Sequence, residues 1–140
     1  MTFKYPTKQE LTVLNNFSCV MEPGKTTAIV GPSGSGKSTV IQLIERFYNP
    51  TRGEILIDGK KIEDLDLYSF RRIVGYVGQE PVLFNDSIKE NMKFAKPDAT
   101  DAEIIEALKM ANAWEFVNKT KDKLDLNVGP GGNQLSGGQK

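Results

Sequence analysis

The sequence predicts an α/β fold that combines part of a parallel sheet with an antiparallel β subdomain and a helical subdomain. The short apolar run at residues 28–30 is typical of a strand covered on both faces, and it leads directly into the Gly-rich stretch 31–39 and a helix expected over residues 40–48. A second buried-looking strand is expected at residues 73–77. After Pro81 the apolar spacing changes from that of strands to that of helices.

The Gly-rich stretch has the pattern of a phosphate-binding loop. Gly31-Pro32-Ser33-Gly34-Ser35-Gly36-Lys37-Ser38-Thr39 matches G-x-x-x-x-G-K-[ST]. Glycines let successive backbone N–H groups converge on a polyphosphate, and the following helix adds its partly positive N-terminus. Lys37 supplies a point charge and Ser38 a hydroxyl for a magnesium ion. A Gly/Ser-rich linker is the alternative, but the flanking strand and helix favour a P-loop NTPase core.

Short strands are expected on both sides of this loop. Before it, they cover residues 2–5, residues 11–20 with a break near Asn15-Asn16, and residues 26–30. After the loop, the helix is expected to end at Asn49-Pro50, because proline disfavours helical geometry in the preceding residue. Residues 54–62 then form a hairpin around Asp58-Gly59, a preferred two-residue turn. We expect this hairpin to join the N-terminal strands in an antiparallel sheet.

A short helix and a polar loop follow the hairpin. Asp66 is a suitable N-cap for a helix that runs to Arg72. The strand at residues 73–77 leads into Gln79, which would lie on the ligand-binding edge of an open α/β sheet. The spacing alone nevertheless favours an ordinary loop residue at Gln79.

The remaining sequence predicts helices. One covers residues 87–93, and a second begins at a capping box in which Thr100 and Glu103 are three residues apart. Trp114, Phe116 and Val117 continue the apolar pattern, and we interpret them as helical core. The alternating charges of residues 119–125 indicate a solvated surface.

Composition narrows the possible partners. The 18 basic and 18 acidic side chains give a net charge of zero, so no long-range field would attract nucleic acid or an anionic membrane. The single cysteine, Cys19, excludes an intrachain disulfide and favours a reducing, cytosolic setting. Without histidine, the chain also cannot form a Cys/His zinc site. No apolar run is long enough to cross a bilayer.

Residues 128–140 form a second Gly-rich segment. By composition it could present N–H groups to an anion or be a flexible linker. Leu135-Ser136-Gly137-Gly138-Gln139 resembles the signature motif of ATP-binding cassette (ABC) proteins. Together with the loop at residues 31–39 and the segments 79–84 and 87–91, it makes nearly the whole chain similar to the nucleotide-binding domain of a multidrug-resistance-type exporter.

The resemblance implies ATP and Mg²⁺ as ligands. Tyr5 would stack on adenine, although the residues alone favour an ordinary strand tyrosine. The loop from Gly31 to Thr39 would hold the phosphates, and Ser38 with Gln79 would contact magnesium. In trans, Ser136, Gly137, Gly138 and Gln139 would contact nucleotide bound to a second nucleotide-binding domain, in a head-to-tail dimer.

The resemblance also implies an organisation. Residues 1–81 would form the nucleotide-binding core with its antiparallel strands, residues 82–134 the helical subdomain, and residues 135–140 a stub that carries the signature motif. The region 79–84 would meet transmembrane domains, which places the segment at the cytoplasmic face of a membrane. No nucleic-acid partner is expected.

The implied function is the ATP-binding portion of a transporter ATPase that couples ATP binding and hydrolysis to export. The family's Walker B acid, catalytic Glu and switch His follow the signature motif and have no counterpart in these 140 residues. The chain alone is therefore expected to bind ATP without turnover. The alternatives are a non-catalytic fragment that binds ATP or a partner cassette, and a non-transport ABC ATPase acting in DNA repair or translation.

Overall fold

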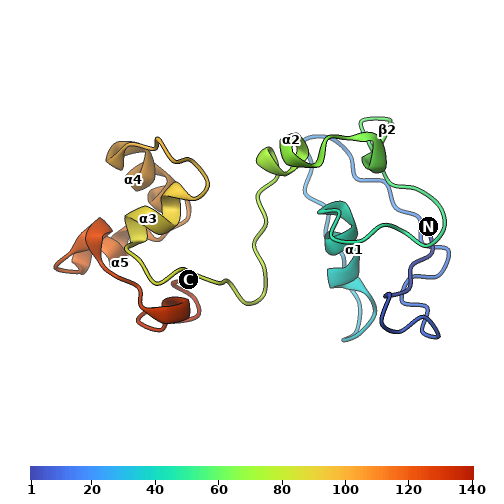
Figure 1. The fold of residues 1–140 in the computed structure, drawn as a ribbon, viewed down its shortest axis with the longest axis horizontal. Coiled ribbons are helices and arrows are strands. Elements are labelled where there is room, and N and C mark those ends of the chain that lie inside the picture. Colours follow the sequence, from blue (N-terminus) through green and yellow to red (C-terminus); the bar gives the residue numbers. More distant parts are fainter. The chain divides into compact units, whose positions relative to one another are not determined.

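The computed structural model describes residues 1–140 and contains two compact units, Met1–Tyr76 (the first unit) and Val77–Lys140 (the second unit). Figure 1 labels the elements of both. The first unit contains α1 (Lys37–Ile44), β1 (Leu56–Ile57), β2 (Lys60–Lys61) and α2 (Leu67–Arg72). The second contains α3 (Ile88–Lys93), α4 (Asp101–Met110) and α5 (Trp114–Lys119). Short 3₁₀ turns lie at Ile62–Asp64, Lys123–Asp125 and Pro130–Gly132. None of the helices is long and apolar enough to cross a membrane.

Helix α1 begins and ends earlier than the sequence predicted. It begins at Lys37, directly after the left-handed Gly36, and ends at Ile44 although Pro50 lies six positions further on. The ending is a Schellman motif: Arg46 is left-handed (φ 53°), Phe47 N–H donates to the Gln42 carbonyl (2.9 Å), and Arg46 N–H donates to that of Leu43 (3.1 Å). Because arginine rather than glycine takes the left-handed position, the sequence carried no signal for this end.

The hairpin prediction is confirmed. Leu56 pairs with Lys61 and Ile57 with Lys60 in antiparallel register, and the Asp58-Gly59 turn has positive φ at both residues (49° and 77°). Such a turn matches the twist of the flanking strands. This two-stranded sheet is the only sheet in the structure.

The expected antiparallel sheet with the N-terminal strands is wrong. Those segments make isolated antiparallel bridges instead, Thr2 with Arg52 and Phe3 with Leu14. The left-handed Asn16 (φ 49°) interrupts the second segment at the predicted break. A bridge of one residue pair cannot extend into a ladder when the chain turns away on either side of it.

The two strands expected in a parallel sheet are also absent. Residues 26–30 and 73–77 belong to no ladder, and most of their apolar side chains face solvent. Val30 is 88% exposed, Ile73 82% and Val77 93%, whereas Ile29 is half-buried against the core of the first unit. A buried strand needs a hydrogen-bonded neighbour on each side and a covering layer on each face. Within residues 1–140 neither segment has such a neighbour, and the apolar pattern of the sequence does not reveal this.

The core of the first unit fixes α1 from one side. Phe3, Leu14, Val40 and Leu43 form its buried centre, and Leu43 is fully buried. Val40 and Leu43 are three residues apart, so they lie on one face of the helix. The buried face of α1 therefore rests on the N-terminal bridges, and its first turn continues directly from the Gly-rich loop.

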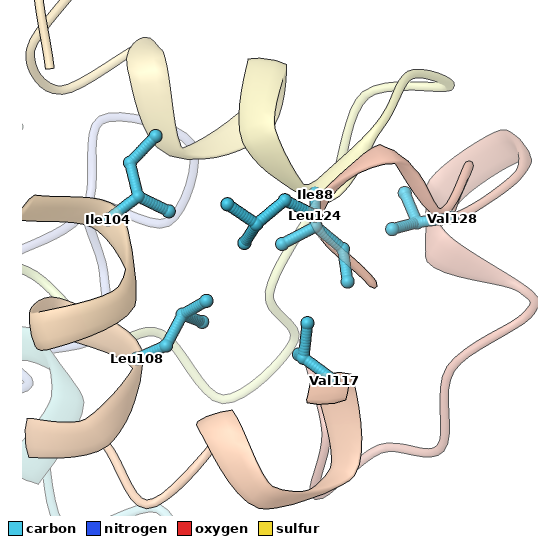
Figure 2. Close-up of a cluster of buried hydrophobic side chains, with 6 residues drawn as sticks. All are labelled: Ile88, Ile104, Leu108, Val117, Leu124 and Val128. Atoms are coloured by element: carbon cyan, nitrogen blue, oxygen red, sulfur yellow. The ribbon is translucent and has the colours of Figure 1, made fainter. Parts of the chain in front are cut away.

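The second unit follows the helical prediction closely. The predicted side-chain caps are present: Ser87 accepts from Glu90 N–H (3.1 Å), and Thr100 forms a capping box with Glu103. Helices α4 and α5 are separated by the left-handed Asn112 (φ 56°), which ends α4 in a second Schellman motif. Figure 2 shows side chains from α3, α4, α5 and the segment after α5 pointing toward one another. The six buried members of this cluster are Ile88, Ile104, Leu108, Val117, Leu124 and Val128.

The capping box gives α4 a defined dependence on pH. Lys96, bonded to Glu103, and the N–H and hydroxyl of Thr100 lower the pKa of Glu103 from 4.5 to about 2. A carboxylate with a lowered folded-state pKa adds stability that is fully present above its unfolded pKa and is lost as the pH falls through the folded one. We therefore expect α4 to lose stability between pH 4.5 and pH 2.

Glu103→Gln tests this expectation, because glutamine can still cap the helix but carries no charge. Acid titrations followed by far-UV circular dichroism should show a smaller loss of helix stability in that pH window than in the wild type. Glu106→Gln, on the same helix and paired with Lys109, leaves the capping box intact and serves as the control. Identical titrations of Glu103→Gln and the wild type would contradict the assignment.

Candidate functional site

The loop before α1 depends on glycine at Gly36. Its φ is +87°, and a Cβ there would lie 2.8 Å from Leu14 Cδ2 and 3.2 Å from Val13 Cγ1. Any other residue would strain the backbone and collide with the N-terminal core. Gly34 is also left-handed (φ 77°), but a side chain there would point into open space. Two residues just before α1, Gly34 and Gly36, therefore have a left-handed backbone conformation, and Gly36 packs against the core of the first unit.

Helix α1 begins without a side-chain cap, unlike α2, α3 and α4; α5 also lacks a cap but carries the acidic Glu115 in its first turn. Asp66, Ser87 and Thr100 each cap the helix that follows them by accepting a backbone N–H. Gly36 has no side chain with which to do so, and the first turn of α1 holds no acidic residue. The N–H groups of this turn are thus left to another acceptor, and the helix dipole favours an anion.

Lys37 adds a full positive charge at the same place. Its Nζ donates to the carbonyl oxygens of Gly31 (2.9 Å) and Pro32 (2.7 Å), so the side chain folds back over the loop. None of the ion pairs in the structure includes Lys37. An ammonium has three donors, and one remains for a further acceptor. The loop end of α1 therefore combines unpartnered N–H groups with an unneutralised cation.

Ser38 follows on the first turn of α1 and is exposed. Its hydroxyl is a suitable ligand for Mg²⁺, a hard cation that prefers oxygen and keeps several waters. The chain contains no group of three or more Asp, Glu, Cys or His side chains that could hold a metal by themselves. The donor set at this end of α1 thus fits a magnesium ion that arrives with phosphate oxygens.

Tyr5 lies beside α1 rather than apart from it. Its hydroxyl is 2.9 Å from Thr39 Oγ1 and donates to Gln42 Oε1 at 2.8 Å. Phe3 and Tyr48 meet its ring edge-on, at centroid distances of 4.9 and 5.2 Å. Thr39 is buried, so its hydroxyl is directed toward Tyr5, and a phosphate contact from Thr39 would use its N–H.

Two arginines hold the other end of α1. Arg71 donates to the carbonyl oxygens of Glu45 and Arg46, and its guanidinium lies 5.0 Å from the Phe47 ring centroid. Arg46 in turn donates to the carbonyl oxygens of Leu65 (2.8 Å) and Glu63 (3.0 Å). Cations at a helix C-terminus complement the dipole that favours an anion at the N-terminus. No motif in the sequence marks these two arginines or Gln42, and only the three-residue spacing of Thr39 and Gln42 indicates a shared helix face.

The other candidate residues belong to the second unit. Gln79 is exposed in the bend that follows residues 73–77. Ser136, Gly137, Gly138 and Gln139 form an exposed turn, in which Gln139 Oε1 accepts the Ser136 N–H (2.9 Å) and Lys140 Nζ donates to the Gly131 carbonyl (2.8 Å). A Cβ at Gly137 or Gly138 would meet no atom within 4 Å. This turn is open on its outer side.

Comparison with known proteins explains why one chain carries both the Gly-rich loop before α1 and the open turn at residues 136–139. The family model described as ABC transporter matches residues 14–140. The chain belongs to the ABC transporter family. It is 51% identical over 138 residues to ABC transporter B family member 1 of Arabidopsis thaliana and 50% identical over 141 residues to Multidrug resistance protein 1 of Entamoeba histolytica. Each match covers 99% of this chain.

A solved structure agrees with this assignment. A bacterial Atm1-family ABC exporter with ATP bound matches 99% of the chain with a TM-score of 0.93 and 40% identity. The backbone of the chain has the nucleotide-binding fold of the ABC transporter family. It spans 11% of the length of either curated relative and 24% of the solved exporter chain.

Proposed function

We propose that this ABC transporter segment binds the triphosphate of Mg·ATP at the loop end of α1. The observation that carries the proposal is the uncapped N-terminus of α1, which follows two left-handed glycines and carries the unpaired Lys37. The N–H groups of residues 34–39 would bind the β- and γ-phosphates, and Lys37 would bind the outer oxygens as a point charge. Tyr5 would stack on the adenine ring, which is worth about 1–3 kcal/mol in nucleic-acid systems.

Magnesium would be bound by Ser38, whose exposed hydroxyl lies on the same turn as Lys37. The ion would supply charge neutralisation between the outer phosphates. Gln79 as a second magnesium contact remains a prediction from the resemblance. The same holds for Ser136, Gly137, Gly138 and Gln139, which would bind the nucleotide of a second, head-to-tail domain; their open turn supports this role.

The longer protein would couple ATP binding and hydrolysis to export. In this proposal the segment lies at the cytoplasmic face of a membrane, and residues 79–84 contact transmembrane domains; the exposed Val82 and Phe84 support such a contact. Hydrolysis proceeds by attack of water on the γ-phosphorus, with positioning and charge stabilisation supplying most of the rate. The similarity to exporters along 99% of the chain favours this function over a non-transport ATPase.

The domain boundaries and the parallel sheet belong to the same proposal. Residues 1–81, 82–134 and 135–140 would be the core, the helical subdomain and the signature stub. In the longer protein, residues 26–30 and 73–77 would pair in the central sheet. Their exposed apolar side chains support this pairing.

Ser38→Ala provides the test of the magnesium site. Wild-type chain should bind ATP more tightly with Mg²⁺ than with EDTA, because the ion links the phosphates to the hydroxyl. In Ser38→Ala we expect the affinity for Mg·ATP to fall on the order of tenfold while the affinity in EDTA is retained. Isothermal titration calorimetry under both conditions measures the difference.

Ser18→Ala, an exposed serine of the same unit, is the matched control and should behave as the wild type. If Ser38→Ala keeps the full gain in affinity from Mg²⁺, Ser38 is not the ligand. If wild-type chain binds no ATP under either condition, the proposed function fails as a whole.

A further inference from the structure

The ring of Tyr5 is tied to α1 by an ordered chain of hydrogen bonds. The Tyr5 hydroxyl has one proton, which it donates to Gln42 Oε1 (2.8 Å). In its contact with Thr39 (2.9 Å) it must therefore accept the Thr39 hydroxyl proton. Each hydroxyl thus donates once in the order Thr39, Tyr5, Gln42, and hydrogen bonds in such chains strengthen one another.

We propose that Gln42 is a positioning residue that fixes the adenine-stacking ring at a set distance from the phosphate loop. The inference rests on the proposed function. Thr39 and Gln42 are three residues apart on α1, so both face the same side of the helix, and Thr39 immediately follows the proposed magnesium ligand. One rigid helix therefore carries the phosphate-binding groups at its start and holds the Tyr5 hydroxyl at its middle.

The aromatic neighbours of Tyr5 leave its ring free to move along α1, and the hydrogen bond to Gln42 restricts this movement. Phe3 and Tyr48 contact the Tyr5 ring edge-on and limit its tilt, but neither contact fixes how far the ring lies along α1. Tyr5 also packs against the cluster that contains Val40 and Leu43 of α1, but its directional contacts with that helix are the two hydrogen bonds of its hydroxyl. An ATP molecule must meet the ring and the loop at once, so an unfixed ring would cost ordering entropy on binding.

Helix α1 does not depend on Gln42 for its own position. Val40 and Leu43 anchor its buried face, and Arg71 holds its C-terminal carbonyls. Loss of the Gln42 amide should thus leave the phosphate-binding loop in place and weaken only the binding of the adenine base by Tyr5. This separates a positioning role from a general structural one.

The test compares two ligands of the full chain by calorimetry: Mg·ATP and magnesium tripolyphosphate, which has phosphates but no base. Gln42→Met keeps the length of the side chain and removes the acceptor. We expect this substitution to lower the affinity for Mg·ATP about three- to tenfold, which corresponds to the net free energy of one hydrogen bond, and to leave the affinity for tripolyphosphate unchanged. Gln42→Glu retains an acceptor and should restore ATP binding. Tyr5→Phe should match Gln42→Met, and the double variant should be no weaker than either single one.

Matched controls are Gln9→Met, an exposed glutamine of the same unit, and Tyr48→Phe, which removes a hydroxyl outside this hydrogen-bond chain. Unchanged ATP affinity in Gln42→Met, or equal losses for ATP and tripolyphosphate, would overturn the inference. So would additive losses in the double variant. If Gln42→Met does not fold, Tyr5→Phe and Gln42→Glu still decide the outcome, because both keep the side-chain volume. Wild-type chain that binds neither ligand would instead refute the proposed function.

Discussion

Lys37→Ala is expected to remove Mg·ATP binding by the chain. The Lys37 ammonium is the only full charge at the loop end of α1, and its hydrogen bonds to phosphate are charge-assisted. Hydrogen bonds to charged groups are worth about 1.5–3 kcal/mol, so the affinity should fall by at least about 10- to 150-fold. Isothermal titration calorimetry of both proteins with Mg·ATP measures this loss.

Two control measurements distinguish the loss of the Lys37 charge from a general loss of folding. AMP lacks the outer phosphates, so its weaker binding should change little in Lys37→Ala. Lys25→Ala removes an exposed lysine that pairs with Glu22 (2.5 Å) and should leave Mg·ATP binding as in the wild type. Because Lys37 also donates to the Gly31 and Pro32 carbonyls, far-UV circular dichroism must show that the variant still folds. Equal ATP affinity in Lys37→Ala and the wild type would contradict the assignment of the loop.

The sequence predicts local structure well where a single residue type determines the backbone. Asp58-Gly59 forms the expected turn, and Asp66, Ser87 and Thr100 cap the expected helices, because each feature needs only its near neighbours in the chain. The two Schellman ends escaped prediction because Arg46 and Asn112 replace the usual glycine.

Pairing between distant segments could not be predicted in the same way. The apolar runs at residues 26–30 and 73–77 indicate burial, but a strand forms only where a neighbour supplies hydrogen bonds, and no local pattern names that neighbour. In the candidate site, too, local features can be predicted from the sequence, but contacts between distant residues cannot. The pattern around Lys37 indicates the phosphate loop, whereas the tie between Tyr5 and Gln42 joins residues 37 positions apart and became visible only in the structure.

The largest loss of stability is expected from Ile104→Ala in the second unit. Ile104 is 2% exposed and lies in the cluster that joins α3, α4 and α5 (Figure 2). Truncating a buried isoleucine to alanine costs about 2–5 kcal/mol through lost burial and the cavity left behind. Domains of ordinary size are stable by only about 5–15 kcal/mol, and a unit this small buries a smaller fraction of its surface. Ile104→Ala should therefore shift the urea midpoint strongly or leave the unit partly unfolded.

Trp114 allows this loss to be located. It is the only tryptophan of the chain, it begins α5, and it packs against the same cluster, so its fluorescence reports on the second unit. Met110→Ala is the matched control, because Met110 is on the same helix but 86% exposed, and such substitutions usually change stability by less than about 0.5 kcal/mol. A lower Trp114 midpoint in Ile104→Ala, with the Met110→Ala midpoint unchanged, would confirm that the cluster holds the helices together. Equal midpoints in the two variants would show that it does not.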